Sequence, residues 1–130
     1  MAKTLMFGLL TLGMVAVLAG CSKGGPGTTP ERAAEDRAKS LEGYDFPIGS
    51  TDIDQGATVF EEFCEGCHPG GEEGDGPKIA GIGVSVSQMR FQVRSGGDDM
   101  PAFDSSKISD EDLEALLAYT VTLGAVDSSL

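Results

Sequence analysis

Apolar residues recur at intervals of three and four from about residue 52 onward, and this spacing predicts helices. The first predicted helix runs from about Asp52 to Glu65, with Thr51 or Asp52 as its N-cap. The second runs from about Ser87 to Ser95, where a pair of glycines stops it. The residues at helical spacing are Phe60, Phe63, Cys64 and Cys67 in the first helix and Val86, Met89, Arg90 and Val93 in the second.

A third predicted helix carries the clearest boundary signals. Ser109 can cap its N-terminus, and the three acidic residues that follow suit the positive end of the helix dipole. Gly124 ends it. Its expected face consists of Leu113, Leu116, Leu117, Thr120 and Val121.

No alternation of apolar and polar residues extends far enough to predict a strand. A glycine-rich loop from Pro69 to Gly83 separates the first two predicted helices. We therefore expect an all-α fold with three main helices.

An almost continuous apolar run, Leu5 to Ala19, follows Lys3 at the start of the chain. It is too short for a membrane-spanning helix and typical of a signal-peptide core. The run ends in Leu18-Ala19-Gly20-Cys21, which resembles the lipobox of bacterial lipoproteins. That resemblance implies that residues 1–20 are a lipoprotein signal peptide and that Cys21 is lipidated. An ordinary signal peptide followed by an incidental cysteine is the alternative.

The next segment has the composition of a tether. Residues 22–30 are rich in glycine, proline, serine and threonine. Residues 31–42 are charged and alanine-rich, and can form a short exposed helix with a thin apolar face. We expect residues 21–50 to be a lipid-attached flexible linker and residues 51–130 to be one small domain.

The formal net charge is −12, and it becomes about −13 when residues 1–20, with their single Lys3, are removed. This balance excludes nucleic-acid binding, which needs a basic face. It favours redox partner proteins with a basic docking face.

The sequence Cys64-Glu65-Gly66-Cys67-His68 is the attachment pattern of c-type haem. Two cysteines one helical turn apart can form thioethers with the two vinyl groups of one porphyrin, and His68 can then ligate the iron. A redox dithiol or part of a zinc site are the alternatives. Zinc needs a fourth ligand, yet the chain has no other histidine, and its remaining cysteine is the distant Cys21. We therefore expect one covalent haem c.

Two methionines remain as candidates for the second axial ligand once the signal peptide is removed. Met89 lies in a predicted helix at core spacing, where methionine usually only packs. Met100 lies in a loop and precedes Pro101, which stiffens the backbone. We therefore expect His68 and Met100 to be the metal ligands, which raises the reduction potential and leaves no open coordination position.

Several motifs together resemble class I cytochrome c over about residues 52–123. Gly56, Phe60 and Cys64 match the family's N-terminal helix, and Leu116 and Tyr119 match the residues packed against it. Residues 74–81 resemble the family loop whose proline carbonyl accepts a hydrogen bond from the haem-ligating histidine. The resemblance implies a small cytochrome c fold around one covalent haem, with Pro77 orienting His68. Met100-Pro101-Ala102-Phe103 resembles the segment that carries the distal ligand.

The chain also departs from the family in ways that matter for partners. It has no tryptophan near the haem propionates, and it lacks the lysine ring with which mitochondrial-type members dock. We interpret Arg90 and Arg94 as solvated helix residues, with pairing to a haem propionate as the alternative.

These features predict a lipid-anchored monohaem electron carrier, monomeric and not an enzyme, exported to the cell envelope and facing the periplasm or the exterior. One alternative is a haem subunit of a larger oxidase or reductase complex. The other is a weak haem peroxidase formed when Met100 leaves the iron.

Overall fold

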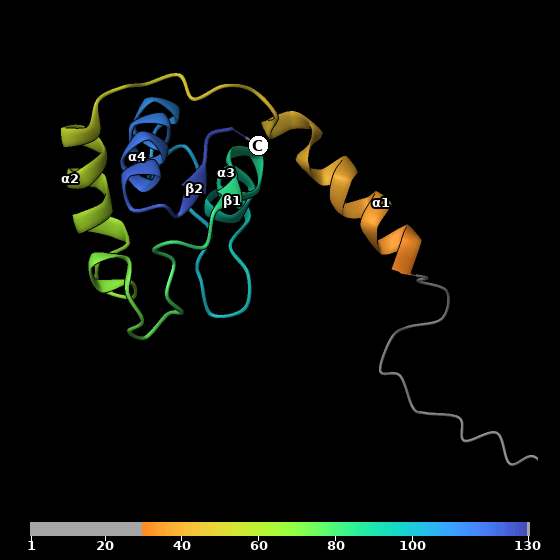
Figure 1. The fold of residues 1–130 in the computed structure, drawn as a ribbon, viewed down its shortest axis with the longest axis horizontal. Helices are drawn as coiled ribbons and strands as arrows, with labels where there is room; N and C mark the ends of the chain where they lie inside the picture. Colours follow the sequence, from red (N-terminus) through yellow and green to blue (C-terminus); the bar gives the residue numbers. More distant parts are fainter. Residues whose placement is uncertain (1–29, 130) are drawn as a thin grey trace, which may run out of the picture.

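The structure, a computed structural model, describes residues 30–129. The predicted signal peptide, the predicted lipidation site Cys21 and residues 22–29 of the predicted linker lie outside the described residues. The described part is mainly helical, as expected for a small cytochrome c fold (Figure 1). Its helices are α1 (Pro30–Leu41), α2 (Ile53–Phe63), α3 (Val86–Ser95) and α4 (Asp110–Thr122), with 3-10 turns η1 at Glu42–Tyr44 and η2 at Pro69–Gly71.

Capping side chains that lie next to each helix in the sequence account for the N-termini of α2, α3 and α4. The carboxylate of Asp52 accepts the backbone N–H of Gln55, and the hydroxyl of Ser109 accepts that of Asp112. Ser85 and Gln88 form a reciprocal capping box at the start of α3. The three predicted helices are thus confirmed, with boundaries shifted by one or two residues.

Among the elements of residues 30–129, helices α2 and α4 make the most extensive contact with each other. A Cβ built on Gly56 would lie 2.7 Å from the carbonyl carbon of Ala115 and 2.8 Å from Cβ of Tyr119. Only glycine allows the two backbones to approach this closely. The rings of Phe60 and Tyr119 lie beside the crossing, with centroids 5.3 Å apart.

A short parallel pair of strands joins two loops. Strand β1 (Val84–Ser85) pairs with β2 (Val126–Asp127). These strands were not predicted, because two residues are too few to produce an alternating pattern.

The core lies between α2, α3 and α4. Its buried hydrophobic cluster consists of Val59, Phe60, Val86, Val93, Ile108, Leu113, Leu116, Leu117 and Val126. Of the predicted face of α2, Phe60 is buried, Phe63 and Cys64 are half-buried, and Cys67 is exposed. The Cys67 side chain therefore stands outside the packed core.

Helix α1 stands away from this body, and the chain then crosses to α2 on the opposite side (Figure 1). Residues 34–40 of α1 are exposed, as the sequence led us to expect. Residues 44–49, which we call the strap, are not free: the backbone carbonyls of Tyr44, Phe46 and Pro47 all accept hydrogen bonds from Arg90. Part of the predicted flexible linker is therefore fastened to the domain. Within residues 30–129, no helix is long and apolar enough to cross a membrane.

Candidate haem site

The two cysteines and the histidine lie on one tight turn at the end of α2. Cys64 is the C-cap of the helix, and the backbone N–H groups of Cys67 and His68 donate to its carbonyl at 3.0 and 2.9 Å. The turn keeps the two thiols about one helical turn apart, which is the spacing that attachment to a single porphyrin edge requires. Cys64 is half-buried and Cys67 exposed, while His68 is only 9% exposed.

The imidazole of His68 is oriented by the following loop. Its Nδ1 lies 2.7 Å from the carbonyl oxygen of Pro77. Because a carbonyl can only accept, this hydrogen bond requires the proton on Nδ1 and leaves Nε2 with a free lone pair. Gly76 makes room for the ring, because a Cβ there would lie 2.5 Å from Cε1 of His68.

The cysteines lack the character of a reactive dithiol. Burial, helped by the nearby Cys67 and Glu65, raises the pKa of the Cys64 thiol to about 11. Redox dithiols work through a thiol whose pKa is lowered. Among residues 30–129, moreover, no three His, Cys, Asp or Glu side chains gather as a metal-binding cluster of the zinc type.

Met100 lies in the loop between α3 and α4, residues 96–109, which we call the Met100 loop. The backbones of Gly97 and Met100 exchange two hydrogen bonds of 3.0 and 2.9 Å. The amide Nε2 of Gln92 donates to the Met100 sulfur at 3.5 Å. Both Met100 and the alternative ligand Met89 are half-buried against the core.

One ring contact links this loop to the haem-attachment turn. Phe63, which precedes Cys64, meets Phe103 of the Met100 loop edge-on, with centroids 5.9 Å apart. The structure therefore brings together two segments that are more than thirty residues apart in sequence. Cys64 and Met100 both pack against the same hydrophobic core.

The interpretation of Arg90 and Arg94 as solvated residues was wrong. Arg90 is fully buried, forms an ion pair with Glu114 at 2.7 Å, and covers the ring of Phe46 with its guanidinium. Arg94, whose side chain is 12% exposed, is bound to Asp110 and to two backbone carbonyls. The sequence places Arg90 at helical spacing with the apolar residues of α3, but it carries no sign of the distant partners of either arginine.

The residues of this site have the chemistry that a covalent haem needs. Two thiols stand on one turn beside an imidazole with a free Nε2 lone pair, and a glycine cradle and a carbonyl fix the ring. Gln92 is a further contact of the candidate ligand Met100 that the sequence analysis did not single out. The signal that could have found it is its position eight residues before Met100, at the end of the helix that leads into the loop.

The chain has relatives among known haem proteins. A family model described as cytochrome c oxidase, cbb3-type, subunit III, matches residues 51–119. Cytochrome c6 of Bryopsis maxima is 33% identical over 78 residues, which cover 52% of this chain and 88% of that protein. Cytochrome c6 of Bumilleriopsis filiformis is 31% identical over 80 residues, covering 55% and 91%.

A third relative is the cytochrome c subunit of 4-cresol dehydrogenase (hydroxylating) from Pseudomonas putida. It is 34% identical over 70 residues, which cover 54% of this chain and 61% of that protein. No solved structure matches the chain at a comparable level. The family match begins at residue 51, so the strap and α1 lie outside it. The matched region carries the haem-attachment turn and most of the packed core. The chain therefore belongs to the cytochrome c family. It is a monohaem class I c-type cytochrome, an electron carrier with covalently attached haem c.

Proposed function

We propose that this protein is a membrane-tethered carrier of single electrons whose haem iron has His68 and Met100 as axial ligands. Cys64 and Cys67 hold the haem covalently, and Pro77 orients His68. The observation that carries the proposal is the 2.7 Å contact between Nδ1 of His68 and the Pro77 carbonyl, because it leaves Nε2 available for the iron.

The haem supplies the redox couple, and the protein supplies a closed, oriented environment for it. Two protein ligands leave no position for substrate, which suits electron transfer rather than bond-making chemistry. A thioether ligand favours ferrous iron and so raises the reduction potential.

The ligand assignment is tested on the oxidised holoprotein. Sulfur ligation gives a weak far-red charge-transfer band, which we expect in the wild type and in Met89→Leu. Met100→Ala should lose the band and lower the potential. A Met100→Ala variant that keeps both properties would show that Met100 is not the ligand.

The tether is proposed from the lipobox-like sequence that ends in Cys21. Acyl chains there would hold the protein on a membrane surface. The 12-residue helix α1 adds a rigid section of about 18 Å to this tether. In native cells, Cys21→Ala should move the holoprotein from the membrane fraction to the soluble fraction, whereas Ser22→Ala should leave it on the membrane. Membrane retention of Cys21→Ala would contradict the anchor.

A second candidate function is a haem subunit of a larger redox complex. It is favoured by the similarity to the cytochrome c subunit of 4-cresol dehydrogenase. Purification from native membranes separates the two candidates, since a subunit should remain in a stable complex while a free carrier should be recovered alone.

A further inference from the structure

The Met100 loop is fastened to the last turns of α3. The backbone N–H of Phe103 donates to the carbonyl of Val93 at 2.9 Å. Gly96 packs so closely under the loop that a Cβ there would lie 2.6 Å from the Met100 carbonyl oxygen. The position of Met100 therefore depends on how firmly the loop stays against this helix end.

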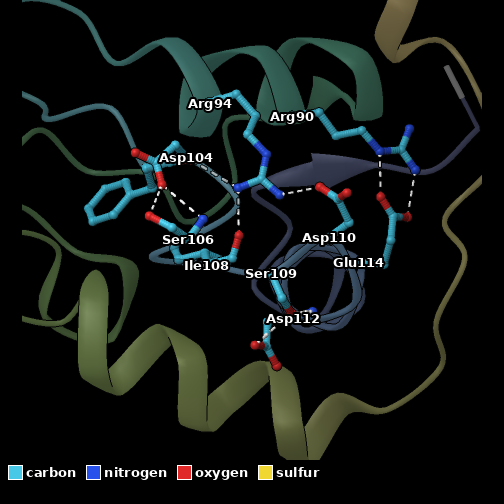
Figure 2. Close-up of polar contacts among 10 residues, drawn as sticks. Arg90, Arg94, Asp104, Ser106, Ile108, Ser109, Asp110, Asp112 and Glu114 are labelled. Carbon is cyan, nitrogen blue, oxygen red and sulfur yellow. Dashed lines mark hydrogen bonds and ion pairs between the residues drawn. The ribbon is translucent and has the colours of Figure 1, made fainter.

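Arg94 makes the strongest polar contacts between α3 and the loop. Its Nη1 donates to the carbonyls of Phe103 at 2.9 Å and Ile108 at 2.7 Å. Its Nη2 donates to Asp110, the first residue of α4, also at 2.7 Å (Figure 2). One guanidinium thus closes both ends of the segment from Phe103 to Ile108 onto the helix.

Arg90 provides an internal comparison. It lies one turn earlier on α3 and pairs with Glu114, one turn later on α4 (Figure 2). Its remaining donors, however, bind the strap carbonyls rather than the Met100 loop. Two arginines with the same chemistry therefore fasten two different irregular segments.

We propose that Arg94 is a positioning residue for the axial ligand: by holding the carbonyls of Phe103 and Ile108, it keeps the Met100 loop closed and the thioether in place. This rests on the proposed ligation of the iron by Met100. Removing the guanidinium leaves two carbonyls without their donor, one of them on the fully buried Ile108. The loss of two charge-assisted hydrogen bonds should raise the population of the open loop at least about tenfold.

The population of the open loop can be measured with imidazole as a competing ligand. An added ligand binds only when the thioether is displaced, so its apparent affinity rises with the open fraction. In oxidised holoprotein we expect Arg94→Met to bind imidazole at least about tenfold more tightly than the wild type. The far-red band of this variant should also disappear at a lower temperature than its helical circular dichroism signal.

The matched control is Arg90→Met, which breaks the equivalent ion pair on the same helix. It should lower the overall unfolding temperature yet leave imidazole affinity unchanged. Equal imidazole affinity of Arg94→Met and the wild type would overturn the proposal, as would an equal gain in Arg90→Met.

Arg94→Lys keeps the positive charge but lacks the planar guanidinium with its several N–H donors. This variant is used for the same measurement if Arg94→Met does not accumulate as holoprotein. It should bind imidazole more tightly than the wild type, and an unchanged affinity would overturn the proposal. Failure of the ligand assignment itself is recognised separately, because Met100→Ala would then keep the far-red band.

Discussion

At the scale of single residues, the setting of His68 depends on the absence of a side chain at Gly76. A Cβ there would lie 2.5 Å from Cε1 and 3.0 Å from each ring nitrogen. Gly76→Ala should therefore push the imidazole away from Pro77 and weaken its hydrogen bond. A less basic imidazole donates less to ferric iron, so we expect a higher reduction potential and a loss of about 1–3 kcal/mol in stability.

A redox titration and thermal unfolding of the holoprotein check this prediction. Gly66→Ala is the matched control, because this glycine lies inside the haem-attachment motif yet has nothing within 4 Å of a Cβ. Its potential should equal that of the wild type. An unchanged potential in Gly76→Ala would mean that the ring does not need this space.

At the scale of elements, the crossing of α2 and α4 rests on Gly56. In an exposed helix, replacing glycine with alanine stabilises by about 1 kcal/mol. At this crossing the added methyl would collide with the backbone of Ala115 and with Tyr119. We therefore expect Gly56→Ala to destabilise the holoprotein by about 3 kcal/mol or more, the opposite sign.

Thermal unfolding followed by circular dichroism measures the effect. Gly43→Ala, in a turn with open space around it, should change the unfolding temperature little. A stable Gly56→Ala variant would show that the two helices can move apart without cost, and that their close approach is not required.

The helices were predictable because their signals are local. Asp52 and Ser109 cap within three residues, and the apolar spacing of α4 lies within a single helix. The haem-attachment motif consists of five consecutive residues, so the turn that it forms could be predicted directly from the sequence. Arg90 shows the limit: it stands at core spacing on α3, but its carbonyl partners lie more than forty residues upstream. The pairing of β1 with β2 is equally distant in sequence and too short to leave a pattern.

At the scale of the whole molecule, the strap joins the proposed tether to the haem domain. Arg90 binds three of its carbonyls, and the backbone N–H of Gly49 donates to Glu114 at 2.7 Å. In the proposed membrane-anchored protein, motion of the domain relative to the anchor would therefore begin before residue 44 rather than at residue 50. The strap lies outside residues 51–119, the region that the family model matches.

Glu114 makes this fastening sensitive to acid. Burial raises the pKa of its carboxyl, but the hydrogen bonds from Arg90 and Gly49, together with the charge of Arg90, lower it more, so that the net pKa lies below the usual value. A lowered folded-state pKa contributes stability that is present above the ordinary glutamate pKa of about 4.3 and is lost as pH falls through the folded value.

Glu114→Gln should therefore unfold at a lower temperature than the wild type at neutral pH, because it leaves the buried Arg90 without its counter-charge. The difference should shrink as pH falls below about 4.3, because the unfolded chain there takes up a proton that the folded carboxylate still excludes, and it should be lost once pH falls through the lowered folded-state pKa. At neutral pH the strap of this variant should be cut faster by chymotrypsin at Tyr44 or Phe46, while the haem spectrum stays that of the wild type. Glu111→Gln, at an exposed position on the same helix, should change both properties much less, because it removes only a first-turn charge that favours the helix dipole weakly. If Glu114→Gln and Glu111→Gln unfold at the same temperature across the whole pH range, Glu114 does not couple the strap to the domain. The hydrogen bonds from Arg90 to the strap carbonyls must then hold the strap alone.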